Sequence, residues 1–205
     1  MIVVGITGSI GMGKSTAADM LREMGIPIHD SDATVHRLLG PGGRAVPPVA
    51  RKFPEAVRKS EAGEQYIDRQ VLGRIVFSDR KKKKDLESIL HPLVREESDL
   101  FKEEMSKKAH PVVALDIPLL FETGGEERVD VTLCITAPPE VQRERVLSRH
   151  GMTSEKFDRI VSGQLPDAEK RRRADFVVDT AGGLEDTRKQ LKQIVNKLLA
   201  AGKYA

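Results

Sequence analysis

The residues with the clearest chemical signature lie near the N-terminus, where glycines and polar residues are spaced for phosphate binding. The stretch Gly8–Thr16 reads GSIGMGKST and satisfies the spacing G-x-x-x-x-G-K-[ST]. In such a loop, backbone N–H groups surround the phosphate oxygens, the lysine reaches the β- and γ-phosphates, and the next hydroxyl binds Mg²⁺. We therefore predict a nucleoside triphosphate site formed by Gly8, Gly11, Met12, Gly13, Lys14, Ser15 and Thr16. Lys14 is also predicted to be catalytic, and Ser15 to be a metal ligand.

Two aspartates follow the second predicted strand, at Asp30 and Asp32. The C-terminal ends of parallel strands face the ligand crevice, so we expect both carboxylates to face the phosphate-binding loop. Phosphoryl transfer has a loose transition state, so orienting the attacking hydroxyl matters more than deprotonating it early. We predict that Asp32 is catalytic and accepts a hydrogen bond from that hydroxyl, whereas Asp30 or Ser31 caps the next helix.

A third aspartate, Asp116, ends another predicted strand. Two roles stay open for it: it orders the water shell of Mg²⁺, or it supports the turn that begins at Pro118. The dipeptide His91-Pro92 interrupts an apolar stripe of helical spacing, and we predict a helix break there, since proline suits the first position of a helix. For the acceptor substrate, the predicted binding residues are Asp32, His36, His91, Pro118 and Leu119.

Residues 138–173 are rich in arginine and have the pattern of two helices joined around His150–Thr153, followed by a shorter one after Pro166. A mobile, basic helical segment beside a phosphate-binding loop would serve as a lid. Arg145 and Arg149 are four residues apart and therefore share one helix face. Because an arginine that reaches the γ-phosphoryl group stabilises transition-state charge, we predict Arg145 as catalytic and Arg149 as nucleotide-binding.

Five apolar runs provide the strands that would position these residues: 2–6, 26–28, 112–116, 131–136 and 176–179. Helical patterns separate them, which predicts an α/β fold with a parallel five-stranded sheet flanked by helices, as in P-loop NTPases. Residues 30–95 contain no good strand and several short helical patterns, so we predict a helical, acceptor-binding insertion there. The nucleotide-binding core would then comprise residues 1–29, 96–137 and 174–205, and the lid residues 138–173.

Composition limits the possible partners. The 205 residues carry 34 basic and 31 acidic side chains, and the two tyrosines and absent tryptophan leave little for stacking on bases. We therefore expect no nucleic-acid partner, and Lys81–Lys84 are interpreted as a solvated helix face. No apolar run approaches the ~18 residues of a membrane helix. Cys134 is the single cysteine, in an apolar run, where we expect it to be buried and inert. The expected protein is a cytoplasmic monomer.

These segments together resemble the dephospho-CoA kinase family from Ile2 to about Leu191. The matching motifs occur in order along the chain, at Thr7–Thr16, Asp30–Asp32, Leu90–Leu93, Pro118–Glu122, Gln164 and Ala174–Asp179. The resemblance implies ATP and dephospho-CoA as substrates, Mg²⁺ as cofactor, Asp32 as the proposed catalytic base, and the insertion as the pantetheine-binding domain. It also implies transfer of the γ-phosphoryl group to the ribose 3′-hydroxyl.

Two positions depart from the family pattern: Ser9 stands where glycine is common, and Thr180 where asparagine is usual. Other small P-loop kinases, of the shikimate, gluconate or nucleoside type, remain alternatives. A shikimate-type kinase would have a glycine triplet after the third strand, where this chain has Asp116–Leu119. The alternative from another class is a nucleotide-gated module that holds RNA or DNA with its basic lid.

Overall fold

The structure, a computed structural model, describes residues 1–77 and 79–201. The chain forms two compact units, one comprising Met1–His29 with the chain from Glu104 onward, and the other Asp30–Glu103. The second unit therefore extends beyond the predicted boundary at residue 95, because a single long helix runs across that position. The predicted core range includes residues 202–205, which lie outside the described residues.

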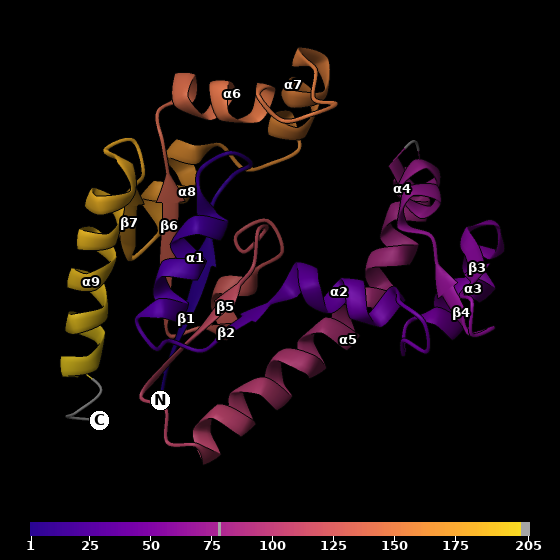
Figure 1. Cartoon of the computed structure of the whole chain (residues 1–205), viewed down its shortest axis with the longest axis horizontal. Helices are drawn as coiled ribbons and strands as arrows, with labels where there is room; N and C mark the ends of the chain where they lie inside the picture. Colours follow the sequence, from indigo (N-terminus) through magenta and orange to yellow (C-terminus); the bar gives the residue numbers. More distant parts are fainter. Residues whose placement is uncertain (78, 202–205) are drawn as a thin grey trace. The chain divides into compact units, whose positions relative to one another are not determined.

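The first unit is built on a five-stranded sheet in the order β2-β5-β1-β6-β7 (Figure 1). The strand β1 runs parallel to β5 and to β6, and β6 runs parallel to β7. The predicted α/β fold with a parallel five-stranded sheet is confirmed. Since the strand order reverses on the two sides of β1, the ligand crevice is expected where β1 ends. The bounds are β1 (Ile2–Thr7), β2 (Ile28–Asp30), β5 (Val112–Asp116), β6 (Val131–Thr136) and β7 (Phe176–Asp179).

One face of this sheet is covered by α1 (Lys14–Glu23) and α9 (Gly183–Ala201). Both helices contribute apolar residues to one buried cluster with the strands, among them Ala17, Met20, Leu21, Leu191, Ile194, Val195 and Leu198. Gly25, with a φ of +83°, follows the end of α1 and takes the left-handed conformation that commonly ends a helix. Leu184, near the start of α9, does not join this cluster, because its side chain is 67% exposed.

The second strand begins later than predicted. The apolar run 26–28 predicted the strand, but β2 comprises Ile28–Asp30. Pro27 has no N–H to donate, so it contributes only its carbonyl, which accepts a hydrogen bond from the Ala114 N–H (2.9 Å). As a result Asp30 is both the last residue of β2 and the residue that precedes the next helix.

The second unit has its own apolar core. Its helices are α2 (Ser31–Leu39), α3 (Val46–Lys52), α4 (Arg69–Phe77) and the greater part of α5 (Arg80–Lys107), with a 3₁₀ turn at Pro54–Ala56. The core is formed by Leu38, Leu39, Ala45, Val46, Val49, Phe53, Ala56, Ile67, Leu72 and Leu90. An independent core is what allows an insertion of this length to fold as a compact unit.

A small hairpin contradicts the expectation that residues 30–95 lack strands. The strands β3 (Val57–Lys59) and β4 (Gln65–Ile67) pair antiparallel, and Gly63 takes a φ of +82° in the turn between them. Each strand has three residues, too few for the alternation of apolar and polar residues that signals a strand in a sequence.

The predicted helix break at His91-Pro92 is also wrong, because α5 is continuous through Pro92. A proline inside a helix removes one backbone hydrogen bond and costs about 3 kcal/mol. Apolar residues on both sides of the proline, including Leu86, Ile89, Leu93 and Val94, pack against the core of the second unit and hold the helix together. The charged run Lys81–Lys84 lies exposed on the same helix, as predicted.

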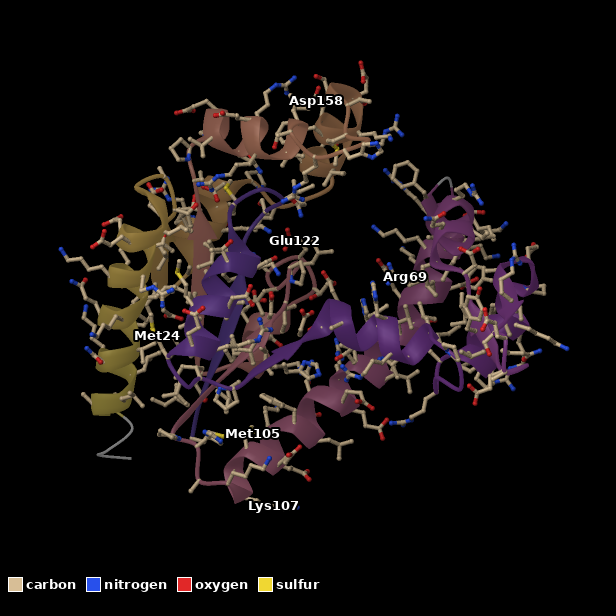
Figure 2. All side chains as sticks on the ribbon, in the orientation of Figure 1. Met24, Arg69, Met105, Lys107, Glu122 and Asp158 are labelled. Carbon is tan, nitrogen blue, oxygen red and sulfur yellow. The ribbon has the colours of Figure 1, made fainter. Side chains whose placement is uncertain are left out.

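The predicted lid segment, residues 138–173, contains the three helices expected from its sequence. They are α6 (Pro139–Leu147), α7 (Ser154–Ser162) and α8 (Asp167–Arg173). Arg143 of α6 pairs with Asp158 of α7 (3.1 Å), the residue labelled on that helix in Figure 2. The guanidinium of Arg143 also lies 5.2 Å from the centre of the Phe157 ring. Arg143 therefore joins the first two lid helices to each other.

Cys134 is fully buried in β6, as predicted. Burial raises the pKa of its thiol to about 12, so the reactive thiolate form is absent at neutral pH. The part of the chain that the structure describes contains no helix long and apolar enough to cross a membrane.

The junction between β6 and β7 gives a prediction about acid stability. The Asp175 carboxylate accepts hydrogen bonds from the Thr132 hydroxyl (2.7 Å) and the Thr132 N–H (2.8 Å), which lower its pKa. A carboxyl group whose pKa is lower in the folded state than in the unfolded state stabilises the fold at pH values above its unfolded-state pKa, which is near 3.9. This stabilisation is lost as the pH falls through the folded-state pKa. We expect Asp175→Asn to lower the Tm at pH 7 by about 2–4 °C, or about 1 kcal/mol. Thermal scans should show the difference from wild type narrowing below about pH 4.

The control is Asp19→Asn, which breaks only an exposed pair with Arg22 (2.7 Å) and should leave the Tm unchanged. A Tm difference for Asp175→Asn that is the same at pH 7 and at pH 3 would contradict the role given to the ionised carboxylate.

Candidate active site

The loop between β1 and α1 is pressed closely against its neighbours. A Cβ added at Gly8 would lie 2.6 Å from the Ile135 carbonyl oxygen. At Gly11, where φ is +79°, it would lie 2.5 Å from Cγ2 of Val146. These glycines are therefore required for packing against β6 and α6, in addition to the approach of phosphate that the motif predicts.

Lys14 begins α1 and forms an ion pair with Asp116 at the end of β5. Both side chains are largely buried, so the pair is shielded from solvent and holds the lysine beside the loop. Asp116 thus has a structural partner in Lys14, and both roles left open for it, ordering the water shell of Mg²⁺ and supporting the turn at Pro118, stay predictions. Ser15 and Thr16 follow in the first turn of α1, both exposed.

The donor set at this site suits Mg²⁺. This ion is usually bound by one or two protein oxygens together with substrate phosphates and water, rather than by a complete protein cage. The site offers the exposed hydroxyl of Ser15 and the nearby carboxylate of Asp116. Among the described residues, no group of three or more histidine, cysteine or acidic side chains forms a separate metal site.

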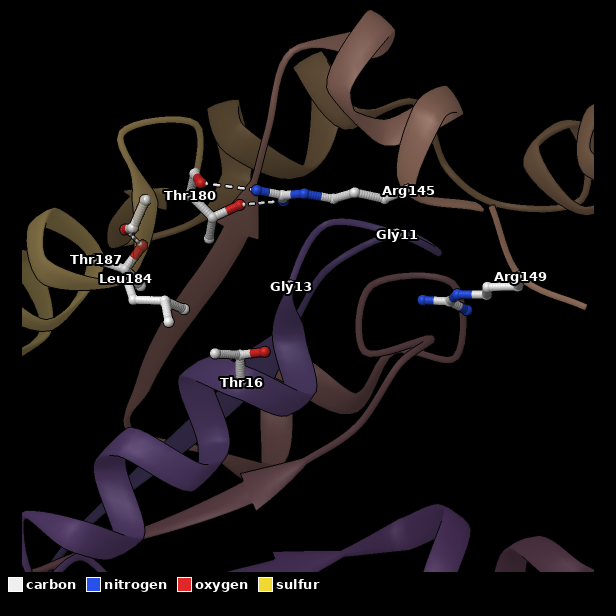
Figure 3. A pocket seen from close by; sticks show the side chains of 9 residues that line it. Gly11, Gly13, Thr16, Arg145, Arg149, Thr180, Leu184 and Thr187 are labelled. Carbon is white, nitrogen blue, oxygen red and sulfur yellow. Dashed lines mark hydrogen bonds between the residues drawn. The ribbon is translucent and has the colours of Figure 1, made fainter. Parts of the chain in front are cut away.

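A cavity of about 390 Å³ opens beside the loop (Figure 3). It is bounded by the loop, the first turn of α1, the helix α6 and the start of α9. Its lining consists of Gly11, Gly13, Thr16, Arg145, Arg149, Thr180, Gly183, Leu184 and Thr187. Both predicted lid arginines therefore meet the phosphate-binding loop at one cavity, and the exposed Leu184 contributes an apolar surface to it.

The two arginines differ in their contacts. The guanidinium of Arg145 donates to the Thr180 hydroxyl oxygen (2.7 Å) and to the Thr180 carbonyl oxygen (2.9 Å), as the dashed lines in Figure 3 mark. Arg149 lines the same cavity and is exposed, but it lies in the turn after α6, which ends at Leu147. The prediction that the two arginines share one helix face is therefore wrong. Within the residues that the structure describes, the Arg149 guanidinium makes no hydrogen bond or ion pair. Arg145 is thus anchored at the end of β7, whereas Arg149 keeps its donors available.

Thr180 is a residue whose importance sequence reasoning missed. It is 5% exposed, and its hydroxyl lies 3.0 Å from the Met12 carbonyl oxygen and 3.2 Å from that of Thr136. The single hydroxyl proton is donated to one of these at a time, and the oxygen accepts from Arg145. One buried threonine therefore links the phosphate-binding loop, the end of β6 and a lid arginine.

In the second unit, Asp30 and Asp32 have different environments. The Asp30 carboxylate accepts a hydrogen bond from the Ala33 N–H (2.9 Å) and so caps α2, as predicted. Asp32 lies exposed in the first turn of the same helix, and His36 lies exposed one turn later. Because residues four apart share a helix face, these two predicted site residues lie side by side on α2.

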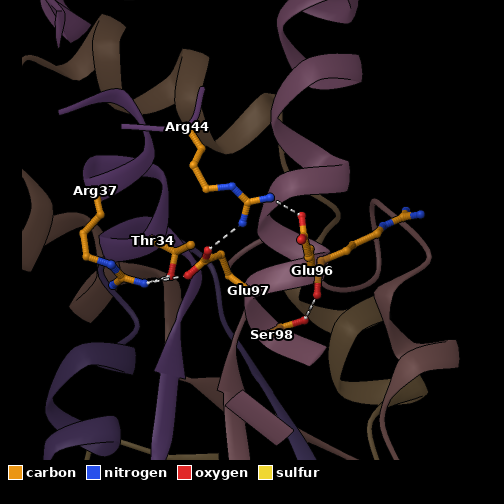
Figure 4. Close-up of polar contacts among 7 residues, drawn as sticks. Thr34, Arg37, Arg44, Glu96, Glu97 and Ser98 are labelled. Atoms are coloured by element: carbon orange, nitrogen blue, oxygen red, sulfur yellow. Dashed lines mark hydrogen bonds and ion pairs between the residues drawn. The ribbon is translucent and has the colours of Figure 1, made fainter. Parts of the chain in front are cut away.

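His36 also lines an open cavity of about 410 Å³ within the second unit, together with Leu39, Gly40, Tyr66, Ile67, Asp68, Arg69 and Gln70. Ion pairs fix α2 and the adjoining chain on α5, since Arg37 and Arg44 both bind Glu97, and Arg44 also binds Glu96 (Figure 4). His91, the other histidine predicted to bind the acceptor, is exposed on α5 and is not among the residues that line this cavity.

Pro118 and Leu119 lie half-buried in the turn that follows β5. The turn is fixed to the end of β1, because the Thr7 hydroxyl donates to the Pro118 carbonyl oxygen (3.1 Å) and the Ile117 N–H donates to that of Ile6 (2.9 Å). The turn thus begins directly beside the phosphate-binding loop.

Comparison with known proteins agrees with this geometry. The family model described as dephospho-CoA kinase matches residues 2–186. The chain belongs to the dephospho-CoA kinase family. It is 48% identical to the dephospho-CoA kinase of Rhodopseudomonas palustris over 196 residues, which cover 96% of this chain and 95% of the relative. It is 50% identical to that of Mesorhizobium japonicum over 198 residues, or 97% of each chain.

Solved structures give the same result. A Thermus thermophilus protein, TT1252, is 42% identical, with a TM-score of 0.81 and coverage of 96% of this chain and 97% of that one. The dephospho-CoA kinase from Campylobacter jejuni is 25% identical, with a TM-score of 0.72 and coverage of 97% and 98%. The chain is accordingly an ATP-dependent phosphotransferase of this family.

The motifs that carried the resemblance to dephospho-CoA kinases have clear structural places. Glu122, the last residue of the Pro118–Glu122 motif, accepts a hydrogen bond from the Leu165 N–H of the lid segment. Gln164 accepts one from the Ile10 N–H of the phosphate-binding loop. At the position where asparagine is usual in the family, Thr180 makes the side-chain contacts described above, so the substitution keeps a hydrogen-bonding residue there.

Proposed function

We propose that this chain transfers the γ-phosphoryl group of ATP to the ribose 3′-hydroxyl of dephospho-CoA, giving CoA and ADP. The observation that carries this proposal is a match to the dephospho-CoA kinase model along residues 2–186, on a chain whose phosphate-binding loop meets two lid arginines at one cavity. We further propose that the protein acts in the cytoplasm as a monomer, with Mg²⁺ and without nucleic-acid or membrane partners.

The acceptor is tested by measuring ADP release from Mg-ATP with dephospho-CoA, shikimate, gluconate, adenosine or no acceptor. We expect strong stimulation by dephospho-CoA alone, with CoA as the product. If dephospho-CoA gave no release above the background, the acceptor assignment would be wrong. A response to another acceptor would then identify a related kinase, and salt-sensitive retention of nucleic acid without turnover would support the binding-module alternative.

In the proposed mechanism, the loop residues Gly8–Thr16 hold the triphosphate, and Lys14 contacts its β- and γ-phosphates. Ser15 would bind Mg²⁺ directly and Asp116 through water. When bound, the ion neutralises charge that develops on the transferred phosphoryl group. Asp32 accepts a hydrogen bond from the attacking hydroxyl and takes its proton as that oxygen bonds to the γ-phosphorus. The bond between the γ-phosphorus and the β–γ bridging oxygen breaks in the same step, and ADP leaves. The acceptor is bound by the unit Asp30–Glu103, where the cavity beside His36 offers a basic and aromatic lining for it.

The pair Asp30 and Asp32 provides a matched test of the proposed base. We expect Asp32→Asn to lower kcat by roughly 10²- to 10⁴-fold, the range for a positioned general base, with little change in the affinity for ATP. Asp30→Asn should stay near wild type, because asparagine also caps a helix and can accept from the Ala33 N–H. Steady-state kinetics with both substrates measure this, and a near-wild-type kcat for Asp32→Asn would remove Asp32 from the mechanism.

For the lid arginines, the contacts favour different roles from those predicted from the sequence. Arg145 is held by Thr180 beside the start of α9, which suits a residue that fixes the nucleoside end of ATP. Arg149 keeps its donors available at the cavity, which suits contact with the transferred phosphoryl group. We therefore propose Arg149 as the residue that stabilises transition-state charge, and Arg145 as one that binds the nucleotide.

The kinetic effects of the two alanine variants should differ accordingly. Arg149→Ala is expected to lower kcat by about 10³-fold, because the interaction it loses is made chiefly in the transition state. Arg145→Ala is expected to raise the KM for ATP about tenfold with a smaller change in kcat. Arg143→Ala, which removes contacts to Asp158, Ser154 and the Phe157 ring but none at the cavity, serves as the control. The opposite pattern, with kcat lost in Arg145→Ala, would restore the catalytic role to Arg145.

A further inference from the structure

We propose that the buried ion pair Glu122–Lys170 is a positioning element of the nucleotide site, which holds Gln164 against the phosphate-binding loop. The Nζ of Lys170 lies 2.8 Å from Oε1 of Glu122. The same oxygen accepts a hydrogen bond from the Leu165 N–H (2.8 Å). Glu122 comes from the turn after β5, where Figure 2 labels it, and Lys170 from α8, so the pair joins two separate parts of the first unit.

This pair is deeply buried. The Lys170 side chain is 0% exposed and that of Glu122 is 17% exposed. Within the described parts of the chain, neither the buried Oε2 of Glu122 nor Nζ of Lys170 has a hydrogen-bond partner, so charge attraction holds the two side chains together. Removing two charges from water is expensive, and apolar residues of similar volume are often as stabilising as a buried ion pair. Stability alone is therefore a weak explanation for a pair in this place, and its neighbours indicate another one.

Leu165, which binds Glu122, is adjacent in sequence to a residue that contacts the phosphate-binding loop. Next to Leu165, the side-chain carbonyl of Gln164 accepts a hydrogen bond from the Ile10 N–H (3.1 Å). The other main-chain polar group of Ile10 is bound as well, because the Gln142 side chain donates to the Ile10 carbonyl oxygen (2.7 Å). Both main-chain polar groups of one loop residue are thus bound by glutamines of the lid segment. The position of Gln164 depends on the Leu165 N–H, and that N–H is held by Glu122.

Glu122 is itself held in place by the turn that carries it. Glu122 lies in the turn whose first residues are attached to the end of β1 through Thr7 and Pro118. Glu122 is therefore anchored to the sheet, and Lys170 holds its carboxylate toward Leu165. A displacement of the carboxylate would shift the segment at Gln164 and, with it, the loop that receives the phosphates. Misplacement by about 1 Å can cost an enzyme up to about 10²-fold in rate.

The test is the double variant E122L/K170M, which removes both charges together and so avoids leaving one unpaired. We expect a Tm within about 4 °C of wild type, together with a Kd for Mg-ADP and a kcat/KM for ATP that are about tenfold worse. Q164A should produce the same loss. Combining it with E122L/K170M should add little further loss, because both changes would disrupt the same contact.

The control is E169Q/R172M, which removes an exposed ion pair (2.6 Å) from the same helix and should leave every parameter unchanged. Wild-type kinetics and ADP affinity in E122L/K170M would overturn the inference. The inference would also be overturned if the fold-losses in ADP affinity and kcat/KM of E122L/K170M and of Q164A multiplied in the combined variant. The ion pair would then act by a route other than Gln164. The inference rests on the proposed function only for the kinetic assay, because the Kd for Mg-ADP requires no acceptor.

If E122L/K170M fails to fold, amide hydrogen exchange of the full-length wild type and Q164A decides the question. The Leu165 and Ile10 amides should both be protected in the wild type. In Q164A the Ile10 amide should exchange faster, whereas the Leu165 amide should remain protected by Glu122. Rapid exchange of the Leu165 amide in the wild type would overturn the inference, as would unchanged ADP affinity in Q164A.

Discussion

The close packing of the phosphate-binding loop is the constraint on which the rest of the first unit depends. At Gly8 and Gly11 the loop backbone is so near β6 and α6 that a Cβ would collide with the Ile135 carbonyl or the Val146 side chain. Because no side chain intervenes, neighbouring residues reach the main chain of the loop itself. Thr180 binds the Met12 carbonyl, and two glutamines bind Ile10. The shape of the phosphate site is therefore fixed by contacts to main-chain atoms.

The same contacts restrict how the lid segment can move. Gln142, in α6, and Gln164, just after α7, both bind the loop at Ile10, and α8 is held through Lys170 and Glu122. Residues 138–173 therefore cannot swing as one rigid body without breaking these bonds. The helix α6 is itself bound, through Gln142 to Ile10 and through Arg145 to Thr180. Any movement toward the phosphates would therefore have to come from the turn after α6, which carries Arg149, and from α7.

Much of this architecture could be predicted from the sequence. The apolar runs around β1, β5, β6 and β7 are continuous, because a parallel sheet covered by helices buries both faces of its strands. Short or interrupted elements were predicted poorly. The hairpin strands β3 and β4 are too short to show periodicity, and Pro92 predicted a helix end that tertiary packing overrides. In both cases contacts with residues distant in sequence, rather than local preference, decide the structure.

The candidate site shows the same division between local and distant information. The phosphate-binding residues follow from one local motif, whereas the Lys14–Asp116 pair and the contacts of Thr180 join residues about a hundred or more positions apart. Its place at the end of a strand predicted that Asp116 lies near the loop, but nothing in the sequence indicates that it pairs with Lys14 or that Thr180 binds the Met12 carbonyl.

The two aspartates after β2 illustrate how the fold separates structural from chemical groups. The chain passes directly from β2 into α2, so Asp30 has the extended backbone of a capping residue, and the Ala33 N–H occupies one oxygen of its carboxylate. Asp32 lies within the helix, where its side chain projects outward and stays exposed. Residues two apart on a helix do not share a face, so the capping bond leaves Asp32 unaffected. Of the two, Asp32 is therefore the carboxylate that retains its full capacity to accept a hydrogen bond from a substrate hydroxyl.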